Sequence, residues 1–142
     1  MIGYFDASAL VKRYVEEANS DFVRRLVEEC YVCTSRISEV EIASALVRRS
    51  REGSIAPAER DRALSRLRED MQSFYVIELF PEVARAARGL LLRYPLRASN
   101  AMQLASSIHV RDSTDAPVIF LAFDGKLNDA AEDQGLTLPP AG

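Results

Sequence analysis

Short apolar runs alternate along this 142-residue chain with longer segments in which apolar residues recur every three to four positions. The short runs predict buried strands, and the longer spacing predicts one face of a helix. Strands are expected at residues 2–5, 32–34, 74–79 and 118–123, with a short edge strand at 136–138. Helices are expected to fill the intervals between them. Strands separated by helices predict a mainly parallel sheet with helices on both faces.

The most continuous apolar run lies at residues 118–123, which predicts a central strand. One helix is expected from Ser38 to Gly53 and another from Pro57 to about residue 74. The short Gly-Ser turn between these two helices predicts that they pair as an antiparallel hairpin. The fold class is therefore α/β, with a doubly wound sheet.

The chain length fits one domain with a core of ordinary size. Hydrophobic residues make up 48% of the sequence and charged residues 27%, the balance of a globular protein. We expect a single domain over residues 1–138 and a short tail at 139–142. The sequence contains no run of about 18 apolar residues, so no membrane span is predicted. The structural pattern begins at Ile2, which leaves no room for a targeting segment and favours a cytoplasmic location.

The formal net charge is −3. This balance argues against nucleic-acid binding through a global basic field, but not against an enzyme whose carboxylates hold cations. Arginines concentrate on the expected helical hairpin, at Arg48, Arg49, Arg51, Arg60, Arg62, Arg66 and Arg68. We interpret them as a solvated surface interleaved with acids; the alternative is a flank that contacts nucleic acid or a protein partner.

Cys30 and Cys33 form a lone C-x-x-C, and His109 is the only histidine. A zinc site needs about four ligands, so this pair lacks its second half. A redox pair would normally open a helix, whereas Cys30 is expected to close one and Cys33 to enter a strand. We interpret both cysteines as buried apolar residues and His109 as an ordinary surface or half-buried residue.

Four polar residues stand at or just inside expected helix starts: Asp6, Glu41, Asn100 and Asp124. Each has a local explanation. Asp6 and Asn100 can cap the helices that follow. Ser38 and Glu41 match a capping box, and Asp124 lies in a common Asp-Gly turn. However, Asp6 and Asp124 directly follow buried strands, and open α/β folds place their sites at the carboxyl edge of a parallel sheet.

Carboxylates gathered at one edge repel one another, and their pKa values rise unless a cation neutralises them. An oxygen-only donor set without a partner histidine suits Mg²⁺ or Mn²⁺. Such ions activate water and stabilise the charge that develops on a phosphodiester. The joint pattern therefore favours metal-dependent phosphodiester chemistry over four independent helix caps.

At these residues the chain resembles the PIN-domain nucleases, in particular the VapC-type toxins of bacterial toxin–antitoxin pairs. The matching segments are YFDASALVK at 4–12, TSRISEVEIASAL at 34–46, LRASNAMQLA at 96–105 and the stretch 120–135. The resemblance implies a three-layer α/β/α PIN-like domain with a sheet of about four to five strands. It implies an endoribonuclease that uses Mg²⁺ or Mn²⁺ and cuts tRNA or ribosomal RNA loops. It also implies a homodimer that a cognate VapB-type antitoxin silences.

Carried over by position, the catalytic and metal-binding residues of the family fall on Asp6, Glu41, Asn100 and Asp124. By the same resemblance, Ser8 would support the first acid through a hydrogen bond. Asp129 would be an outer acid, although an exposed helix position explains it equally well. Arg97, close to position 100, is a candidate for an RNA phosphate or antitoxin contact.

Asn100 departs from the family pattern, which carries aspartate at this position. An amide oxygen can coordinate a cation but brings no negative charge, so we expect weaker metal affinity and a weakened or inactive enzyme. Because Asn and Asp are nearly isosteric, the fold should survive. The sequence leaves open whether the change is natural or introduced.

Three functions follow from these residues. The leading one is the metal-dependent endoribonuclease toxin. The second, motivated by Asn100, is a non-catalytic PIN-like binding protein that forms a complex with an antitoxin. The third is a phosphate-accepting signalling or phosphatase domain, which is disfavoured because Asp6 has no adjacent second acid and no lysine ends a late strand.

Overall fold

A four-stranded, wholly parallel sheet forms the centre of the molecule, which we describe from a computed structural model over residues 1–140. Its strands are β1 (Ile2–Phe5), β2 (Tyr31–Ser35), β3 (Tyr75–Ile77) and β4 (Val118–Leu121), in the order β3-β2-β1-β4. In β1, Gly3 pairs with Val32 on one side and Ile119 on the other. The expected parallel sheet of four to five strands is confirmed. Part of the expected tail, residues 141–142, lies outside the described residues.

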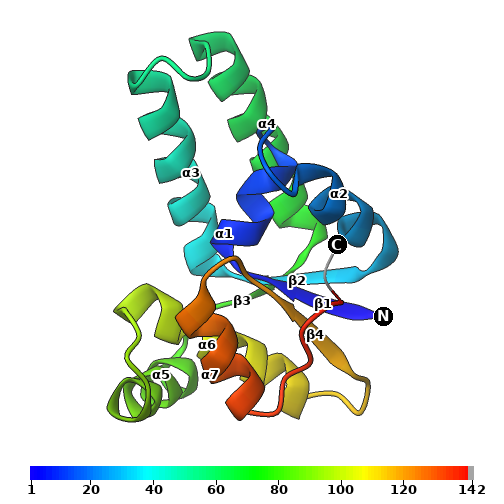
Figure 1. The fold of residues 1–142 in the computed structure, drawn as a ribbon, viewed down its shortest axis with the longest axis vertical. Coiled ribbons are helices and arrows are strands. Elements are labelled where there is room, and N and C mark those ends of the chain that lie inside the picture. The colour runs from blue at the N-terminus through cyan, green and yellow to red at the C-terminus, as the bar shows by residue number, and fades with distance from the viewer. Residues whose placement is uncertain (141–142) are drawn as a thin grey trace.

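Helices cover both faces of the sheet (Figure 1). One face carries α1 (Ala7–Leu10), the 3-10 turn η1 (Val11–Arg13), α2 (Ser20–Glu29), α3 (Arg36–Arg51) and α4 (Pro57–Ser73). The other face carries α5 (Pro81–Arg93), α6 (Ala98–Asp112) and α7 (Gly125–Asp133). This arrangement confirms the three-layer α/β/α class. It also confirms the antiparallel hairpin of α3 and α4, which projects away from the sheet.

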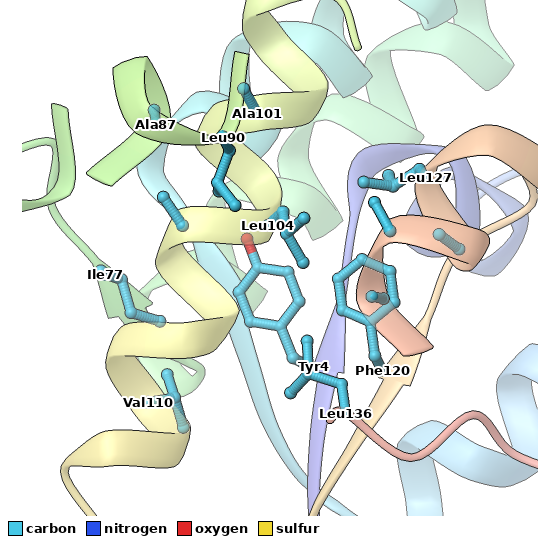
Figure 2. Close-up of a cluster of buried hydrophobic side chains, with 14 of the residues drawn as sticks. Tyr4, Ile77, Ala87, Leu90, Ala101, Leu104, Val110, Phe120, Leu127 and Leu136 are labelled. Atoms are coloured by element: carbon cyan, nitrogen blue, oxygen red, sulfur yellow. The ribbon is translucent and has the colours of Figure 1, made fainter. Parts of the chain in front are cut away.

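The alternation of side chains along β1 builds two separate cores. Tyr4 faces α5, α6 and α7, whereas the next residue, Phe5, faces the helices of the opposite layer. The Tyr4 ring stacks on Phe120 of β4, with 5.8 Å between ring centroids (Figure 2). Tyr4 and Phe5 are fully or almost fully buried, so both faces of β1 are covered.

The structure corrects the expected position of residues 118–123. β4 lies at the end of the sheet rather than in its centre, and it stops at Leu121. Its outer edge is bridged at one position, where Phe120 N donates to the Thr137 carbonyl. The expected edge strand at 136–138 is therefore reduced to this one bridge. The run is apolar because helices bury both faces of β4, and burial of the faces does not depend on the number of strand neighbours.

Two expected helix starts are also corrected. β2 continues through Ser35, whose hydroxyl accepts from the Ile37 N–H at 3.3 Å, so α3 begins at Arg36. Ser38 is consequently buried inside α3, and the expected capping box is wrong. The backbone stays extended through Arg97, so α6 begins at Ala98 and places Asn100 within its first turn instead of at its cap.

Cys30 is half-buried at the end of α2 and Cys33 is buried in β2, so the expected burial holds fully for Cys33 alone. Both are free thiols. Cys30 packs closely over the backbone of Gly3, where an added Cβ would stand 3.0 Å from the Cys30 sulfur and 2.9 Å from the Phe5 ring. A side chain at position 3 would therefore displace its neighbours. Among residues 1–140, no helix combines the length and apolar character that crossing a membrane requires.

Candidate active site

The expected acids meet at the carboxyl edge of the sheet. β1 and β4 are parallel neighbours that end together, since Phe5 pairs with Leu121. Asp6 follows the first strand, and Asp124 follows the second after a two-residue turn. Each also caps the next helix: Asp6 Oδ1 accepts from Ala9 N at 2.9 Å, and Asp124 Oδ1 accepts from Leu127 N at 3.0 Å. Capping and a role in the site are thus compatible in both residues.

Ser8 holds the Asp6 carboxylate from the side. Its hydroxyl oxygen lies 2.7 Å and 3.0 Å from the two carboxylate oxygens and accepts a hydrogen bond from Phe123 N at 2.9 Å. The serine thereby connects the turn after β1 with the turn after β4. This geometry is what a supporting residue beside the first acid requires.

Asp6 is strongly perturbed. Its side chain is 3% exposed, and burial is the main reason that its pKa rises from 3.8 to about 7. The hydrogen bonds from Ser8 and Ala9 oppose this rise, while the charges of Glu41 and Asp124 add to it. Asp6 therefore interacts electrostatically with both Glu41 and Asp124, although the three residues come from segments far apart in the chain. A cation beside Asp6 would relieve both the burial and the repulsion.

Asn100 joins this group from the first turn of α6. Its amide nitrogen donates to Asp124 Oδ2 at 3.2 Å, the oxygen that does not cap α7. A carboxylate at position 100 would repel Asp124 unless a cation lay between them, whereas the amide binds it directly. Asn100 is thus compatible with a site that holds together without a metal.

A cavity of about 510 Å³ opens beside these residues. Its lining residues are Glu41, Pro95, Leu96, Arg97, Ser99, Asn100, Asp124 and Lys126. Arg97 and Lys126 are exposed, and neither forms an ion pair with any residue in the range 1–140. The cavity therefore combines carboxylates with two positively charged side chains, Arg97 and Lys126. This is the charge pattern that suits a phosphodiester next to a metal site.

Sequence reasoning missed two features of this site. The first is Lys126, which lines the cavity. The only indication of it in the sequence is its position two residues after Asp124. Gln103 is buried on α6 and donates to Glu41 Oε1 at 2.9 Å. Its signal was its place one helical turn after Asn100, on the same face of the helix.

Other candidates lie apart from the cavity. Asp129 is exposed on α7 and does not line it, so its role as an outer acid stays a prediction. His109 is half-buried and meets the Phe80 ring edge-to-face at 5.0 Å. Of the hairpin arginines, Arg49 pairs with Glu17 and Arg60 with Asp61, which fits a surface interleaved with acids.

The donor set fits a hard divalent cation, because every candidate ligand atom is a carboxylate or amide oxygen. Within residues 1–140, no three Asp, Glu, His or Cys side chains lie close enough together to enclose an ion by themselves. Mg²⁺ typically keeps several water molecules and uses only one or two protein carboxylates. A partly hydrated ion is therefore the form that these residues could hold.

The PIN domain model matches residues 3–133. The chain belongs to the PIN-domain family. The match spans β1 through α7 and includes every residue of the acidic group, so the PIN domain here contains the whole candidate site.

Among curated relatives, Ribonuclease VapC45 of Mycobacterium tuberculosis is 29% identical and covers 97% of this PIN-domain chain and 94% of its own length. The fold is similar to that of the M. tuberculosis toxin VapC20, whose structure is described as a sarcin-ricin loop cleaving toxin. That alignment has a TM-score of 0.67 and 18% identity, covering 90% of this chain and 94% of the other. A toxin–antitoxin complex from Klebsiella pneumoniae matches with a TM-score of 0.59, 18% identity and coverage of 82% and 83%.

Proposed function

We propose that this PIN-domain protein is an endoribonuclease toxin that hydrolyses RNA phosphodiester bonds at the acidic cavity. The observation that carries the proposal is the buried Asp6, whose pKa is raised to about 7 beside Glu41 and Asp124. Buried, mutually repelling carboxylates destabilise a fold, and they concentrate where chemistry needs them. The curated relative VapC45 is named a ribonuclease, which supports RNA as the substrate.

Asp6, Glu41, Asp124 and the Asn100 amide oxygen would together hold a partly hydrated Mg²⁺ or Mn²⁺, with water molecules completing its coordination. The bound ion would supply an activated water and would stabilise the negative charge that develops on the phosphate. Since Asn100 brings no charge, the site offers the ion three negative charges instead of the four of the family pattern. We therefore expect this chain to bind metal weakly and to turn over slowly, or not at all.

The remaining residues orient the substrate and the first acid. Arg97 and Lys126 lie on the rim of the cavity, where their charges can bind the phosphates that flank the cut. Burial raises the pKa of Asp6, and a bound cation would favour the ionised carboxylate that coordinates it. Ser8 fixes the orientation of that carboxyl group.

The proposed partners follow from the relatives. A VapB-type antitoxin would block the cavity, as expected for a protein similar to the toxin of a toxin–antitoxin complex. A structured RNA loop in tRNA or ribosomal RNA is the proposed substrate, in line with the sarcin-ricin loop that VapC20 cleaves. The proposal includes a single functional domain at residues 1–138, a homodimer and action in the cytoplasm, where this RNA is found.

One observation favours a second function. The Asn100 amide nitrogen donates to Asp124 Oδ2, an interaction that the aspartate of the family pattern could not make, and this favours a non-catalytic protein that binds an antitoxin. The deciding experiment incubates the purified chain and its Asn100→Asp variant with total bacterial RNA, with Mn²⁺ or with EDTA, and uses Asp6→Ala in each background as the blank. The nuclease proposal expects Mn²⁺-dependent cuts that Asn100→Asp enhances. It fails if neither chain cuts RNA above its blank, and the binding function would then take its place.

A further inference from the structure

A chain of buried polar groups lies directly beneath Glu41. Gln103, which is 1% exposed, donates through its Nε2 to Glu41 Oε1 at 2.9 Å and to Ser38 Oγ at 3.0 Å. Its Oε1 accepts from the Tyr4 hydroxyl at 2.5 Å. Figure 2 shows this hydroxyl directed toward α6. One amide therefore joins β1, α3 and α6 below the cavity.

The two ends of this hydrogen-bonded network determine the direction of each hydrogen bond within it. Thr34 Oγ1 lies 2.7 Å from both the Phe5 carbonyl and Ser38 Oγ. A hydroxyl has one proton and a carbonyl can only accept, so the proton between the two hydroxyls comes from Ser38. Ser38 Oγ is then free to accept from Gln103. At the other end the carboxylate of Glu41 also can only accept.

These constraints leave a single orientation for the amide. If Gln103 were turned over, its carbonyl oxygen would face the Glu41 carboxylate and Ser38, and two acceptors would oppose each other in a buried place. Tyr4 reinforces the observed orientation from the opposite side. The Tyr4 hydroxyl is fully buried, and its one proton is donated to the Gln103 carbonyl oxygen.

This network differs from the other buried polar groups of α6 because one of its ends, Glu41, lies at the cavity. Ser106 and Ser107, on the same helix, each donate to a backbone carbonyl of α6 itself. Gln103 instead donates both amide protons to side chains of α3, and one of these acceptors is the half-buried Glu41, which lines the cavity. An apolar residue of the same volume would fill the space without any need for partners.

We propose that Gln103 is a positioning residue that holds the Glu41 carboxylate in the site, with its amide oriented by Tyr4. The inference rests on the proposed function, since it assigns Gln103 a role in catalysis through Glu41. It predicts that Gln103 acts on the rate through the position of one acid and leaves the affinity for RNA unchanged.

The first arm of the test needs no enzymatic activity. Urea unfolding is measured for Gln103→Met, Glu41→Ala and the double variant. If the amide bonds Glu41, the two changes should be non-additive by about 10-fold in the unfolding equilibrium constant. Ser107→Ala is the matched control, because it removes a buried hydrogen bond on the same helix and should add to Glu41→Ala without coupling. Additive effects of Gln103→Met and Glu41→Ala would overturn the proposal.

The second arm measures RNA cleavage in the Asn100→Asp chain at varied Mn²⁺. Gln103→Met should lower kcat by about 10- to 100-fold, as expected for a displaced catalytic group, with KM for RNA unchanged. Tyr4→Phe should have a smaller effect in the same direction, and Ser107→Ala should have none. An unchanged kcat in Gln103→Met would overturn the proposal. If coupling is present but the Asn100→Asp parent cleaves nothing, the hold on Glu41 stands and the nuclease function fails.

Discussion

Replacing Asp6 by Asn should stabilise the protein at alkaline pH. The pKa of Asp6 is 3.8 for a free side chain and about 7 in the folded chain. The folded state therefore binds an extra proton between these values, and stability decreases as the pH rises from 3.8 to 7. Above pH 7 the full destabilisation is present. At about 1.4 kcal/mol per pKa unit, the destabilisation amounts to about 4 kcal/mol.

The substitution removes this cost while keeping the local structure. The Asn side-chain oxygen can still accept from Ala9 N and cap α1, and the new amide can donate to the Ser8 hydroxyl. We expect Asp6→Asn to raise the free energy of unfolding by about 3–4 kcal/mol at pH 8. At pH 5 the gain should fall to about 1–2 kcal/mol, because the folded carboxyl group keeps its proton there and only the ionisation of the unfolded chain above pH 3.8 contributes.

Urea unfolding monitored by circular dichroism at pH 5 and pH 8, in EDTA, measures both values. Asp129→Asn is the matched control: it removes an equal charge from an exposed position and should change the stability by less than about 0.5 kcal/mol at either pH. A gain for Asp6→Asn that is equal at the two pH values, or absent at pH 8, would refute the assignment of a buried, strained carboxylate. With Mn²⁺ in place of EDTA, the native chain should gain more stability than Asp6→Asn.

Three further predictions concern the surroundings of the site. Gly3→Ala should cost about 1–3 kcal/mol in urea unfolding, because the new Cβ would press on the Cys30 sulfur; unchanged stability would contradict the close approach. Ser8→Ala removes a bond that lowers the pKa of Asp6, so carboxyl NMR should show that pKa rising above about 7. Lys126→Ala should weaken RNA binding and reduce the salt slope of log affinity by about 0.7, whereas an unchanged slope would exclude a phosphate contact.

The local patterns of the sequence determined much of this fold. Short continuous apolar runs identified the four strands, and apolar residues spaced three to four positions apart identified the helices between them. Strands that are buried on both faces are apolar throughout, whereas a helix buries only one face. The pattern also placed Asp6 and Asp124 at strand ends. Because parallel strands end at a common edge, two members of the site could be brought together from the sequence alone.

Helix starts were less well determined. The hydroxyls of Ser35 and Ser38 are equally suitable caps by type, and only the length of β2 decides between them. The same holds for α6, where the extended backbone through Arg97 sets the start and moves Asn100 into the first turn. Local sequence offers several caps of similar energy, and the surrounding packing selects one.

Strand order and the support of the site were decided by the tertiary structure. The apolar run of β4 indicates only that both faces of the strand are buried. Helices can bury both faces of an outer strand as completely as those of a central strand, so the run does not reveal the position of β4 in the sheet. The hydrogen bonds of Gln103 reach Glu41 and Tyr4, which are 62 and 99 residues away along the chain. Such contacts leave no periodic trace in the sequence, because they depend on how helices cross the sheet and not on neighbouring residues.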